Sequence, residues 1–436
     1  MPHHRKASPW QWIPTLYIAE GLPYFAVNTL TVLMYVKMGI GLKEMAFFTG
    51  WLYLPWVIKP FWSPFVDLFK TKRLWTIAMQ LIIAGALAAV GFLLPTSFFF
   101  SATLVFFWIM AFASATHDIA ADGYYMIELT PHEQAAFVGV RSTFYRIASV
   151  IGQGGLVILA GLLEEHYGDI PMAWSGVFLT LSVFFLLIAL YHTRLLPRAE
   201  GDKPQPGVTA RTIMRDFGMT FVTFFKKPHI LSALAFMLLY RLPEALCIKL
   251  VQPFLVAPRA EGGLELTTTQ VGFVNGTVGV IALLAGGIAG GLAISRGGLK
   301  KWLWPMALSL TIPCVFYCLL AMWMPQNFWI ICSAIGLEQF GYGFGFTAFM
   351  LYLIYFSQGE NKTSHYAFCT AFMALGMMLP GMAAGWIHEI LSGFSLPGAD
   401  GPQGYVNFFW VVMLSCMATF GVCMNVKIDP SFGKKS

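Results

Sequence analysis

Long stretches of apolar residues constrain this chain more than any motif in it. A helix of about 20 apolar residues crosses the hydrocarbon core of a bilayer, and runs of that length recur along the whole sequence. The predicted spans are 12–36, 46–66, 74–95, 98–126, 137–163 and 172–194, then 229–256, 268–293, 302–323, 327–355, 364–388 and 405–425. This pattern predicts an all-α polytopic membrane protein with 12 transmembrane helices.

Composition narrows the possible functions. Of the 436 residues, 57% are hydrophobic and only 11% are charged, whereas about a quarter of the residues in soluble domains are charged. The predicted spans leave room for no sizeable soluble domain, which argues against a water-soluble enzyme. The 27 Lys and Arg residues are spread over short loops rather than gathered in an aromatic-interleaved patch, so we expect no nucleic-acid partner.

A single long polar segment, rich in proline and basic residues, divides the chain into two halves. We predict a six-helix bundle over residues 1–194, a cytoplasmic linker over 195–227 and a second six-helix bundle over 228–436. With a cytoplasmic amino terminus, the cytoplasmic segments hold 19 Lys and Arg and the external loops hold 3. The positive-inside rule then places both termini in the cytoplasm, and the first span is expected to act as an uncleaved insertion signal.

The two halves resemble each other in sequence. Leu22-Pro23 in the first span corresponds to Leu242-Pro243 in the seventh, at an offset of 220 residues. Residues 161–165 correspond to 385–389, and the loop at 67–73 corresponds to the loop at 295–301. Matches in the same order along both halves predict two pseudo-symmetric six-helix bundles, as in many secondary transporters.

Charged side chains inside the predicted spans are the main functional signal, because an isolated charge in hydrocarbon persists only beside a partner, a cavity or a substrate. Residues on four different helices fall at a similar depth, about 10 to 13 Å from the predicted cytoplasmic ends at 1.5 Å per residue. Asp118 and Asp122 are four residues apart and share one helix face, so their repulsion favours a proton on one of them. The candidates for proton coupling and ion pairing are Glu20, Lys59, Asp118, Asp122 and Arg146.

Other polar residues are candidates for lining a substrate cavity. Tyr17, Glu20, Tyr24 and Asn28 follow helical spacing, so one face of the first span should look inward. The cavity candidates are Tyr24, Asn28, Arg141, Gln153, Arg241, Glu244, Glu338, Gln339 and His365. The alternative is that these groups form structural ion pairs between helices. Lys249 lies near the external end of its span and is expected to extend to the interface without a functional role.

Sites for other chemistry are not expected. All seven cysteines fall inside apolar runs of the second half and are interpreted as reduced core residues. Gly341, Gly343 and Gly345 lie inside a span, without the strand and helix that a phosphate loop requires; there they suit close helix packing. We therefore predict no catalytic residues, no metal and no cofactor, with a proton gradient as the energy source.

Several motifs resemble those of the AmpG-like permeases of the major facilitator superfamily, which are related also to acetyl-CoA transporters. The motifs are Gly21-Leu22-Pro23-Tyr24, Lys59-Pro60-Phe61-Trp62-Ser63-Pro64, the run from Ala115 to Asp122, the run from Gly336 to Phe349, and His365-Tyr366-Ala367 with Gly376 and Gly385. The resemblance covers nearly the whole chain. It implies two bundles around a central cavity in a bacterial inner (plasma) membrane, alternating access, and proton-driven import of cell-wall fragments.

The superfamily's gate-loop motif is present in altered form. The candidates in the first gate loop (residues 67–73) are Asp67, Lys72 and Arg73, and those in the second gate loop (residues 291–301) are Gly291, Arg296, Lys300 and Lys301. Leu68 and Lys70 replace the usual Arg and Gly, Ser295 replaces the usual Asp, and His117 stands where the family usually has Gln. The resemblance therefore implies gate loops that act asymmetrically.

The predicted function is a secondary active transporter, a monomeric proton symporter that imports peptidoglycan-derived anhydromuropeptides. Its partners are the small-molecule substrate, protons and the lipid bilayer. Alternatives that the sequence leaves open are a carrier of acyl-CoA, peptide or siderophore, a multispan membrane enzyme, and a non-transporting sensor. The sequence lacks the large loop and catalytic constellation that such an enzyme needs, and a sensor would leave the intramembrane charges unexplained.

Overall fold

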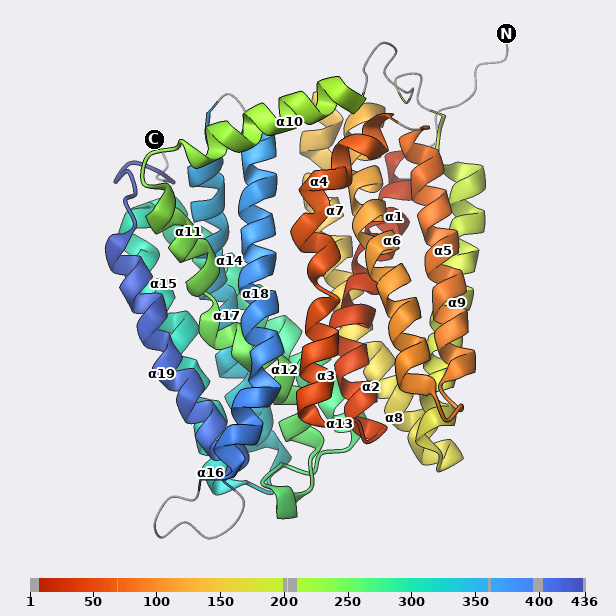
Figure 1. Cartoon of the computed structure of the whole chain (residues 1–436), viewed down its shortest axis with the longest axis vertical. Coiled ribbons are helices and arrows are strands. Elements are labelled where there is room, and N and C mark those ends of the chain that lie inside the picture. The colour runs from red at the N-terminus through yellow and green to blue at the C-terminus, as the bar shows by residue number, and fades with distance from the viewer. Residues whose placement is uncertain are drawn as a thin grey trace. The chain divides into compact units, whose positions relative to one another are not determined.

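The computed structural model describes residues 8–68, 70–198, 202, 210–359, 362–394 and 403–433, and every regular element in these ranges is helical (Figure 1). The helices of the first half are α1 (Pro9–Phe25), α2 (Thr31–Lys37), α3 (Leu42–Trp51), α4 (Leu54–Leu68), α5 (Lys72–Leu93), α6 (Phe99–Glu128), α7 (Pro131–Val150), α8 (Leu156–Tyr167) and α9 (Ile170–Leu195). Two π-helical segments, η1 (Ala26–Leu30) and η2 (Ile151–Gly155), join α1 to α2 and α7 to α8.

The second half continues the same plan. After α10 (Ala210–Phe225) come α11 (Ile230–Leu239), α12 (Leu242–Val256), η3 (Arg259–Glu261), α13 (Thr268–Gly272), η4 (Phe273–Gly279), α14 (Val280–Gly297), α15 (Leu299–Thr311), η5 (Ile312–Cys314), α16 (Val315–Trp323), α17 (Phe328–Ser357), α18 (Lys362–Ser392) and α19 (Gly404–Asn425).

Each predicted span coincides with helix. In the described part of the chain, 10 helical stretches are long and apolar enough to cross a membrane. The other two predicted spans, 12–36 and 46–66, correspond to α1 with α2 and to α3 with α4. The second of these is interrupted just before Pro55, whose nitrogen cannot donate to a helix.

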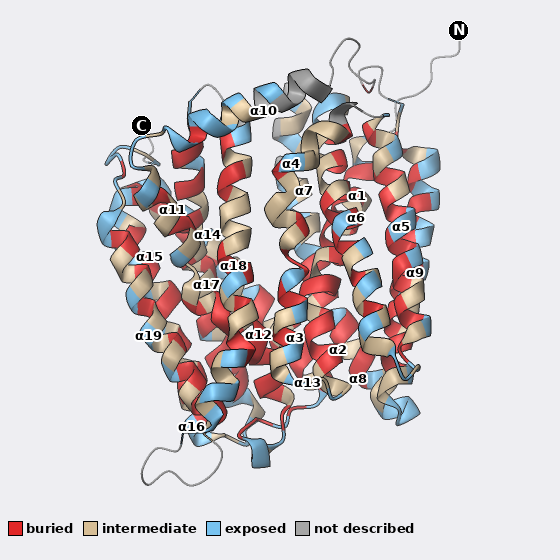
Figure 2. Ribbon diagram, in the orientation of Figure 1, coloured by how far each residue is buried: buried red, intermediate tan, exposed pale blue. Residues whose placement is uncertain are grey.

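Side-chain burial fits a protein surrounded by lipid. Buried residues line the helix sides that face neighbouring helices, and exposed residues cover the other sides (Figure 2). On α14 the exposed side chains of Ile281, Ile288 and Leu292 lie along one face at helical spacing. A large apolar surface of this kind is stable in a bilayer and unstable in water.

Contacts group the residues into two compact units, Met1–Met34 with Ile58–Asp216 and Tyr35–Val57 with Phe217–Ser436. The predicted bundle boundaries differ from this grouping at residues 35–57, which precede the linker in sequence yet pack within the second unit. There α3 packs along α18 (Figure 1). Contact between the backbones is close, because a Cβ atom on Gly385 would lie 2.5 Å from the Leu42 carbonyl oxygen.

The predicted linker contains a helix that the polar composition obscured. In α10, apolar residues at 213, 217, 221, 224 and 225 recur at helical spacing. Phe224 is fully buried against Phe368 and Phe372 of α18. The apolar face of α10 is therefore held by α18, across whose end the helix lies (Figure 1).

Glycines bring α14 and α17 into backbone contact in the second unit. A Cβ atom on Gly286 would collide with the carbonyl oxygen of Phe340, and one on Gly343 would collide with that of Leu283. This explains the glycine run in α17 as a packing device.

We predict that Gly286→Ala lowers the free energy of unfolding by about 1–3 kcal/mol, because the added methyl group meets backbone that cannot rotate away. Thermal unfolding in detergent measures the change. Gly287→Ala is the matched control on the same helix, since its Cβ would lie 3.8 Å from the nearest atom. Equal losses in the two variants would contradict the packing explanation.

Candidate functional site

Lys59 on α4 and Asp118 on α6 form an ion pair inside the first unit. The Lys59 Nζ lies 3.4 Å from the Asp118 Oδ2, and the two side chains are 29% and 15% exposed. Both residues belong to transmembrane helices, where a charge without a counter-ion is costly. The pair is open enough for a ligand or water to reach it.

Asp122 forms a second ion pair one turn along the same face of α6. Its Oδ1 accepts a hydrogen bond from the Arg141 Nη2 of α7 at 2.8 Å and another from the Tyr17 hydroxyl of α1 at 3.2 Å. The Arg141 guanidinium also lies 4.7 Å from the centre of the Tyr17 ring. The four-residue spacing of Asp118 and Asp122 therefore presents both carboxylates to cations on neighbouring helices.

Glu20 of α1 lies buried near these two pairs. It is 8% exposed, and its Oε2 has no hydrogen-bond partner among the described residues. The charges that act on it are those of Asp122, Asp118, Arg141 and Lys59. The charged cluster, which we define as Glu20, Lys59, Asp118, Asp122 and Arg141, contains three acids and two bases.

Arg146 does not join the charged cluster. It lies exposed on α7, and Arg141 reaches the acidic face of α6 in its place. Five residues turn an α-helix by about 140° beyond one full turn, so the two arginines point in different directions. The depth predicted from sequence grouped Arg146 with the cluster. The position of each residue around the helix axis shows that Arg141 faces the cluster instead.

The remaining candidates of the first unit lie at the π-helical segments. Asn28 in η1 is buried, and its Nδ2 donates to the Tyr24 carbonyl oxygen at 3.0 Å, while its Oδ1 has no partner in the described ranges. Gln153 lies half-buried in η2, and η1 contacts η2. Single π-helical turns are frequent at functional sites, because they expose backbone groups and reorient side chains.

In the second unit, the candidate charges are neutralised locally. Arg241, at the break between α11 and α12, binds both carboxylate oxygens of Glu244 at 2.7 and 2.6 Å. It also donates to the Tyr342 hydroxyl at 2.9 Å and lies over the Phe346 ring. This arginine is held in a box of aromatic rings, with its charge balanced by a residue one turn away.

Glu338 and His365 have neutral partners. The Glu338 Oε2 accepts hydrogen bonds from the Tyr317 hydroxyl and the Gln339 side chain, both at 2.8 Å. The His365 Nε2 lies 3.1 Å from the Thr223 hydroxyl of α10, and its Nδ1 is buried without a partner among the described residues. The second-unit candidates therefore form separate groups rather than one cluster.

The prediction that Lys249 extends to the membrane interface is wrong. It is 1% exposed and donates to the Thr49 hydroxyl of α3 at 3.0 Å, with its ammonium 5.3 Å from the centre of the Tyr53 ring. Residues 35–57 pack over this part of α12, which sequence distance from the helix end cannot show. Lys249 and Thr49 form a buried polar contact between α12 and α3.

Sequence reasoning also missed a buried hydrogen-bond chain in the first unit. The Gln80 side chain of α5 bonds the His117 Nε2 of α6 at 2.9 Å and the His192 Nδ1 of α9 at 3.0 Å. The His192 Nε2 in turn lies 2.9 Å from the Thr15 hydroxyl of α1. This chain fixes the rotation of α6, and therefore the direction of the neighbouring Asp118. Scattered polar residues on separate spans were its only sequence signal.

The gate-loop candidates differ between the two halves. Lys72 and Arg73 are bonded within the first unit, as described below, whereas Gly291, Arg296, Lys300 and Lys301 are exposed. The side chain of Asp67 lies outside the described part of the structure. The asymmetry that the altered motif implies is therefore visible in the basic residues.

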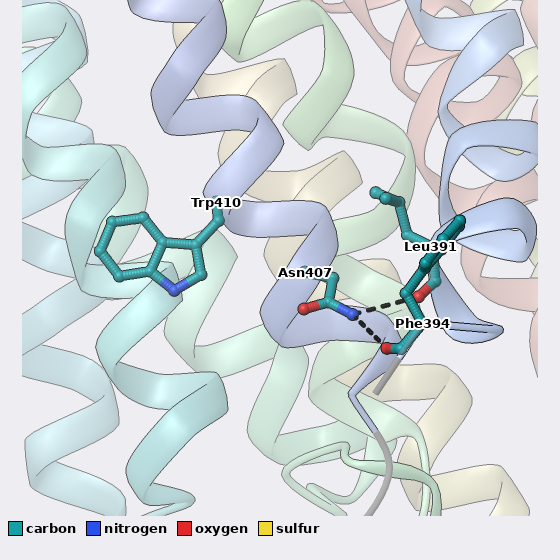
Figure 3. Close-up of a pocket in the computed structure, with 4 residues that line it drawn as sticks. All are labelled: Leu391, Phe394, Asn407 and Trp410. Carbon is teal, nitrogen blue, oxygen red and sulfur yellow. Dashed lines mark hydrogen bonds between the residues drawn. The ribbon is translucent and has the colours of Figure 1, made fainter. Parts of the chain in front are cut away.

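A pocket at the junction of α18 and α19 is unlike the charged cluster. Leu391, Phe394, Asn407 and Trp410 line it, and Asn407 donates to the carbonyl oxygens of Leu391 and Phe394 at 3.1 and 2.8 Å (Figure 3). Asn407 thus ties the two helix ends together. None of the four lining residues carries a charge.

Candidate ligands for a metal are scattered. No three His, Cys, Asp or Glu residues in the described ranges are placed to hold a metal ion together. All seven cysteines are buried and unpaired, as predicted for reduced core residues.

Comparisons with known proteins agree with this architecture. The sequence profile of the BT1 family matches residues 18–329. The anhydromuropeptide permease of Escherichia coli (strain K12) is 28% identical over 386 residues, which cover 86% of this chain and 73% of that protein.

Solved structures share the fold. A nucleoside transporter, NupG, superposes with a TM-score of 0.70 at 14% identity, covering 96% of this chain and 99% of that one. A D-xylose-proton symporter gives a TM-score of 0.70 at 11% identity, covering 98% of this chain and 99% of that one. The predicted all-α membrane fold of the major facilitator superfamily is confirmed.

We predict opposite effects on stability from two changes at the buried lysine. Lys249→Met, which replaces the ammonium with an apolar side chain of similar length, should leave the unfolding temperature unchanged or raise it. Thr49→Val removes the only oxygen that accepts a hydrogen bond from Lys249 among the described residues, and should cost about 1–3 kcal/mol. Thermal unfolding in detergent measures both. A large loss of stability in Lys249→Met would show that the charge itself is stabilising.

Proposed function

The chain belongs to the BT1 family and is a membrane transporter of the major facilitator superfamily; from this premise we propose that it is a proton symporter that imports peptidoglycan-derived anhydromuropeptides by alternating access. The charged cluster is the observation that carries the proposal. It places an open ion pair, Lys59 with Asp118, near a buried carboxylate, Glu20.

The charge balance of the cluster supports coupling to protons. With three acids and two bases, the fully ionised cluster has one uncompensated negative charge, and one proton makes it neutral. Neutrality is strongly favoured where water is excluded. Binding of a proton at Asp118 or Glu20 is therefore the step that prepares the cluster to receive a substrate.

Exchange of ion-pair partners links the proton to the substrate. Protonation of Asp118 frees the Lys59 ammonium, which then pairs with a carboxylate of the incoming substrate. Loss of the proton on the cytoplasmic side restores the Lys59–Asp118 pair and expels the substrate. A proton and an anionic substrate thus bind together and leave together.

The substrate class rests on the similarity to the anhydromuropeptide permease and on the chemistry of the site. Anhydromuropeptides carry sugar rings and carboxylates, which suit aromatic faces and paired cations. Tyr24 and Lys59, both in the first unit, are the residues we assign to contact these groups.

The setting we propose is a bacterial inner membrane, with both termini in the cytoplasm and the protein acting as a monomer. The excess of Lys and Arg in the corresponding loops supports this orientation. No cofactor and no catalytic step are part of the cycle, since the proton gradient supplies the energy.

Uptake of labelled anhydromuropeptide into proteoliposomes, with and without an imposed inward proton gradient, tests the function. We expect accumulation that a protonophore abolishes. Uptake that is equally fast without a gradient would refute the coupling. Absence of uptake by a folded preparation would refute the substrate class.

We predict that Asp118→Asn abolishes gradient-driven accumulation, because an amide cannot carry the coupled proton. Exchange of internal for external substrate across the membrane of preloaded vesicles should stay partly intact. The two assays are run on the same proteoliposomes. Glu261→Gln, which neutralises an exposed carboxylate in η3, is the control and should keep full accumulation. If Asp118→Asn retains accumulation, the proton must bind elsewhere.

A further inference from the structure

Asp202 caps the start of α5 beside the first gate loop. Its Oδ1 accepts a hydrogen bond from the Lys72 amide at 2.6 Å and its Oδ2 accepts one from the Arg73 amide at 2.9 Å. It is 7% exposed. A carboxylate at this position satisfies amides that have no partner within the helix and interacts favourably with the helix dipole.

Further bonds tie the same loop to the end of the sixth predicted span. The Arg73 Nε donates to the Leu196 carbonyl oxygen at 2.8 Å, and its Nη2 donates to that of Thr193. The stem of Lys72 lies against Gly123 of α6, where a Cβ atom would be 2.9 Å from the lysine Cε. Lys72 and Arg73 are thereby engaged within their own unit.

The second unit repeats the arrangement with different chemistry. The Leu299 amide, at the start of α15 beside the second gate loop, donates to the Phe432 carbonyl oxygen at 3.0 Å. Asp429 lies 227 residues after Asp202, close to the offset between the gate loops. Its carboxylate accepts from the Ser431 amide, and its own amide donates to the Tyr355 hydroxyl. In each half the chain after the last helix returns to the gate loop: the Asp202 carboxylate makes the contact in the first half, and the Phe432 carbonyl oxygen makes it in the second.

The linker is anchored again in the second unit. Thr223 bonds His365 of α18, and the Lys227 ammonium donates to the carbonyl oxygens of Phe356 and Gln358 at 2.6 and 2.7 Å. The sequence from 203 to 222 therefore joins two fixed points, Asp202 at one end and Thr223 at the other.

We propose that Asp202 is a positioning residue that fixes the linker to the first gate loop, and that this anchor sets the rate of conformational exchange during transport. Asp202 joins the gate loop and the start of α5 to the chain that follows α9, so that these parts move together. When the anchor is weakened, α5 and the gate loop no longer move with the chain that follows α9, and the conformational exchange slows. Substrate affinity is unaffected, because Asp202 lies outside the charged cluster.

A plain helix cap is the alternative explanation, and the chain supplies a matched control for it. Asp169 caps α9 in the same unit by accepting from the Met172 amide at 2.8 Å, at the end of the bundle away from the gate loop. Asp202→Asn and Asp169→Asn therefore remove the same charge from the same kind of position. A capping role alone would lower the stability of both variants without slowing the conformational exchange in either.

The experiment measures the rate of conformational switching in the absence of substrate. Dyes are attached to Tyr167→Cys and Glu261→Cys, one exposed position in each unit, while the seven native cysteines are buried. Single-molecule energy transfer on the full-length protein in nanodiscs gives the switching rate. We expect Asp202→Asn to slow switching about fivefold, because the amide nitrogen cannot accept one of the two backbone hydrogen bonds and the loss of one hydrogen bond costs about 1 kcal/mol. Asp202→Glu should restore much of the rate, and Asp169→Asn should not change it.

Hydrogen exchange of the peptide containing Lys72 and Arg73 tests the contact itself. We expect faster exchange there in Asp202→Asn and unchanged exchange in Asp169→Asn. Faster hydrogen exchange in Asp202→Asn, with an unaltered rate of conformational switching, would overturn the proposal and leave Asp202 as a helix cap. Unaltered exchange at Lys72 and Arg73 would overturn it by showing that the contact is absent in solution. Faster switching in Asp202→Asn would also overturn it.

Discussion

The high cost of a charge in hydrocarbon governs the arrangement of the rest of the structure. Each transmembrane charge must have a partner, and partners on different helices fix how those helices rotate and approach. In the first unit, Asp118 and Asp122 on one face of α6 draw in Lys59 from α4 and Arg141 from α7. The site is therefore also part of what holds the bundle together. A proton that neutralises one carboxylate weakens a helix contact at the same time, and this links chemistry to movement.

The two units meet this constraint differently. The first leaves an acid in excess, whereas the second pairs Arg241 with Glu244 and surrounds Glu338 with neutral donors. A duplicated fold has thus diverged in its electrostatics while keeping its helices. In the proposed cycle the proton binds in the first unit, where the acid is in excess. The asymmetry of the gate loops follows the same division.

Sequence reasoning was strongest where one-dimensional patterns fix three-dimensional structure. Run length predicted the spans, and four-residue spacing predicted the shared face of Asp118 and Asp122. It failed where the answer depends on which helices become neighbours. The predicted depth in the membrane grouped Arg146 with the charged residues, although its position around the helix turns it away from them. The distance from the helix end placed Lys249 at the membrane interface, although α3 covers it. The hydrogen-bond chain of Gln80, His117 and His192 joins three helices, and single polar residues on separate spans do not show in the sequence that they meet.

Glycine-rich packing and the π-helical segments explain how a structure held by buried charges can still move. Close backbone contact, as between α14 and α17, makes rigid pairs of helices that move as bodies. The π-helical turns η1 and η2 lie within α1–α2 and α7–α8, and they contact each other beside Asn28 and Gln153. A π-helical turn interrupts the regular hydrogen-bond pattern of the α-helix, and such turns are frequent at functional sites. The closely packed pair α14 and α17 lies in the second unit, whereas η1 and η2 lie in the first unit, next to the helices that bear Glu20 and Arg141. A change of charge at these residues therefore acts on helices that continue into a π-helical turn.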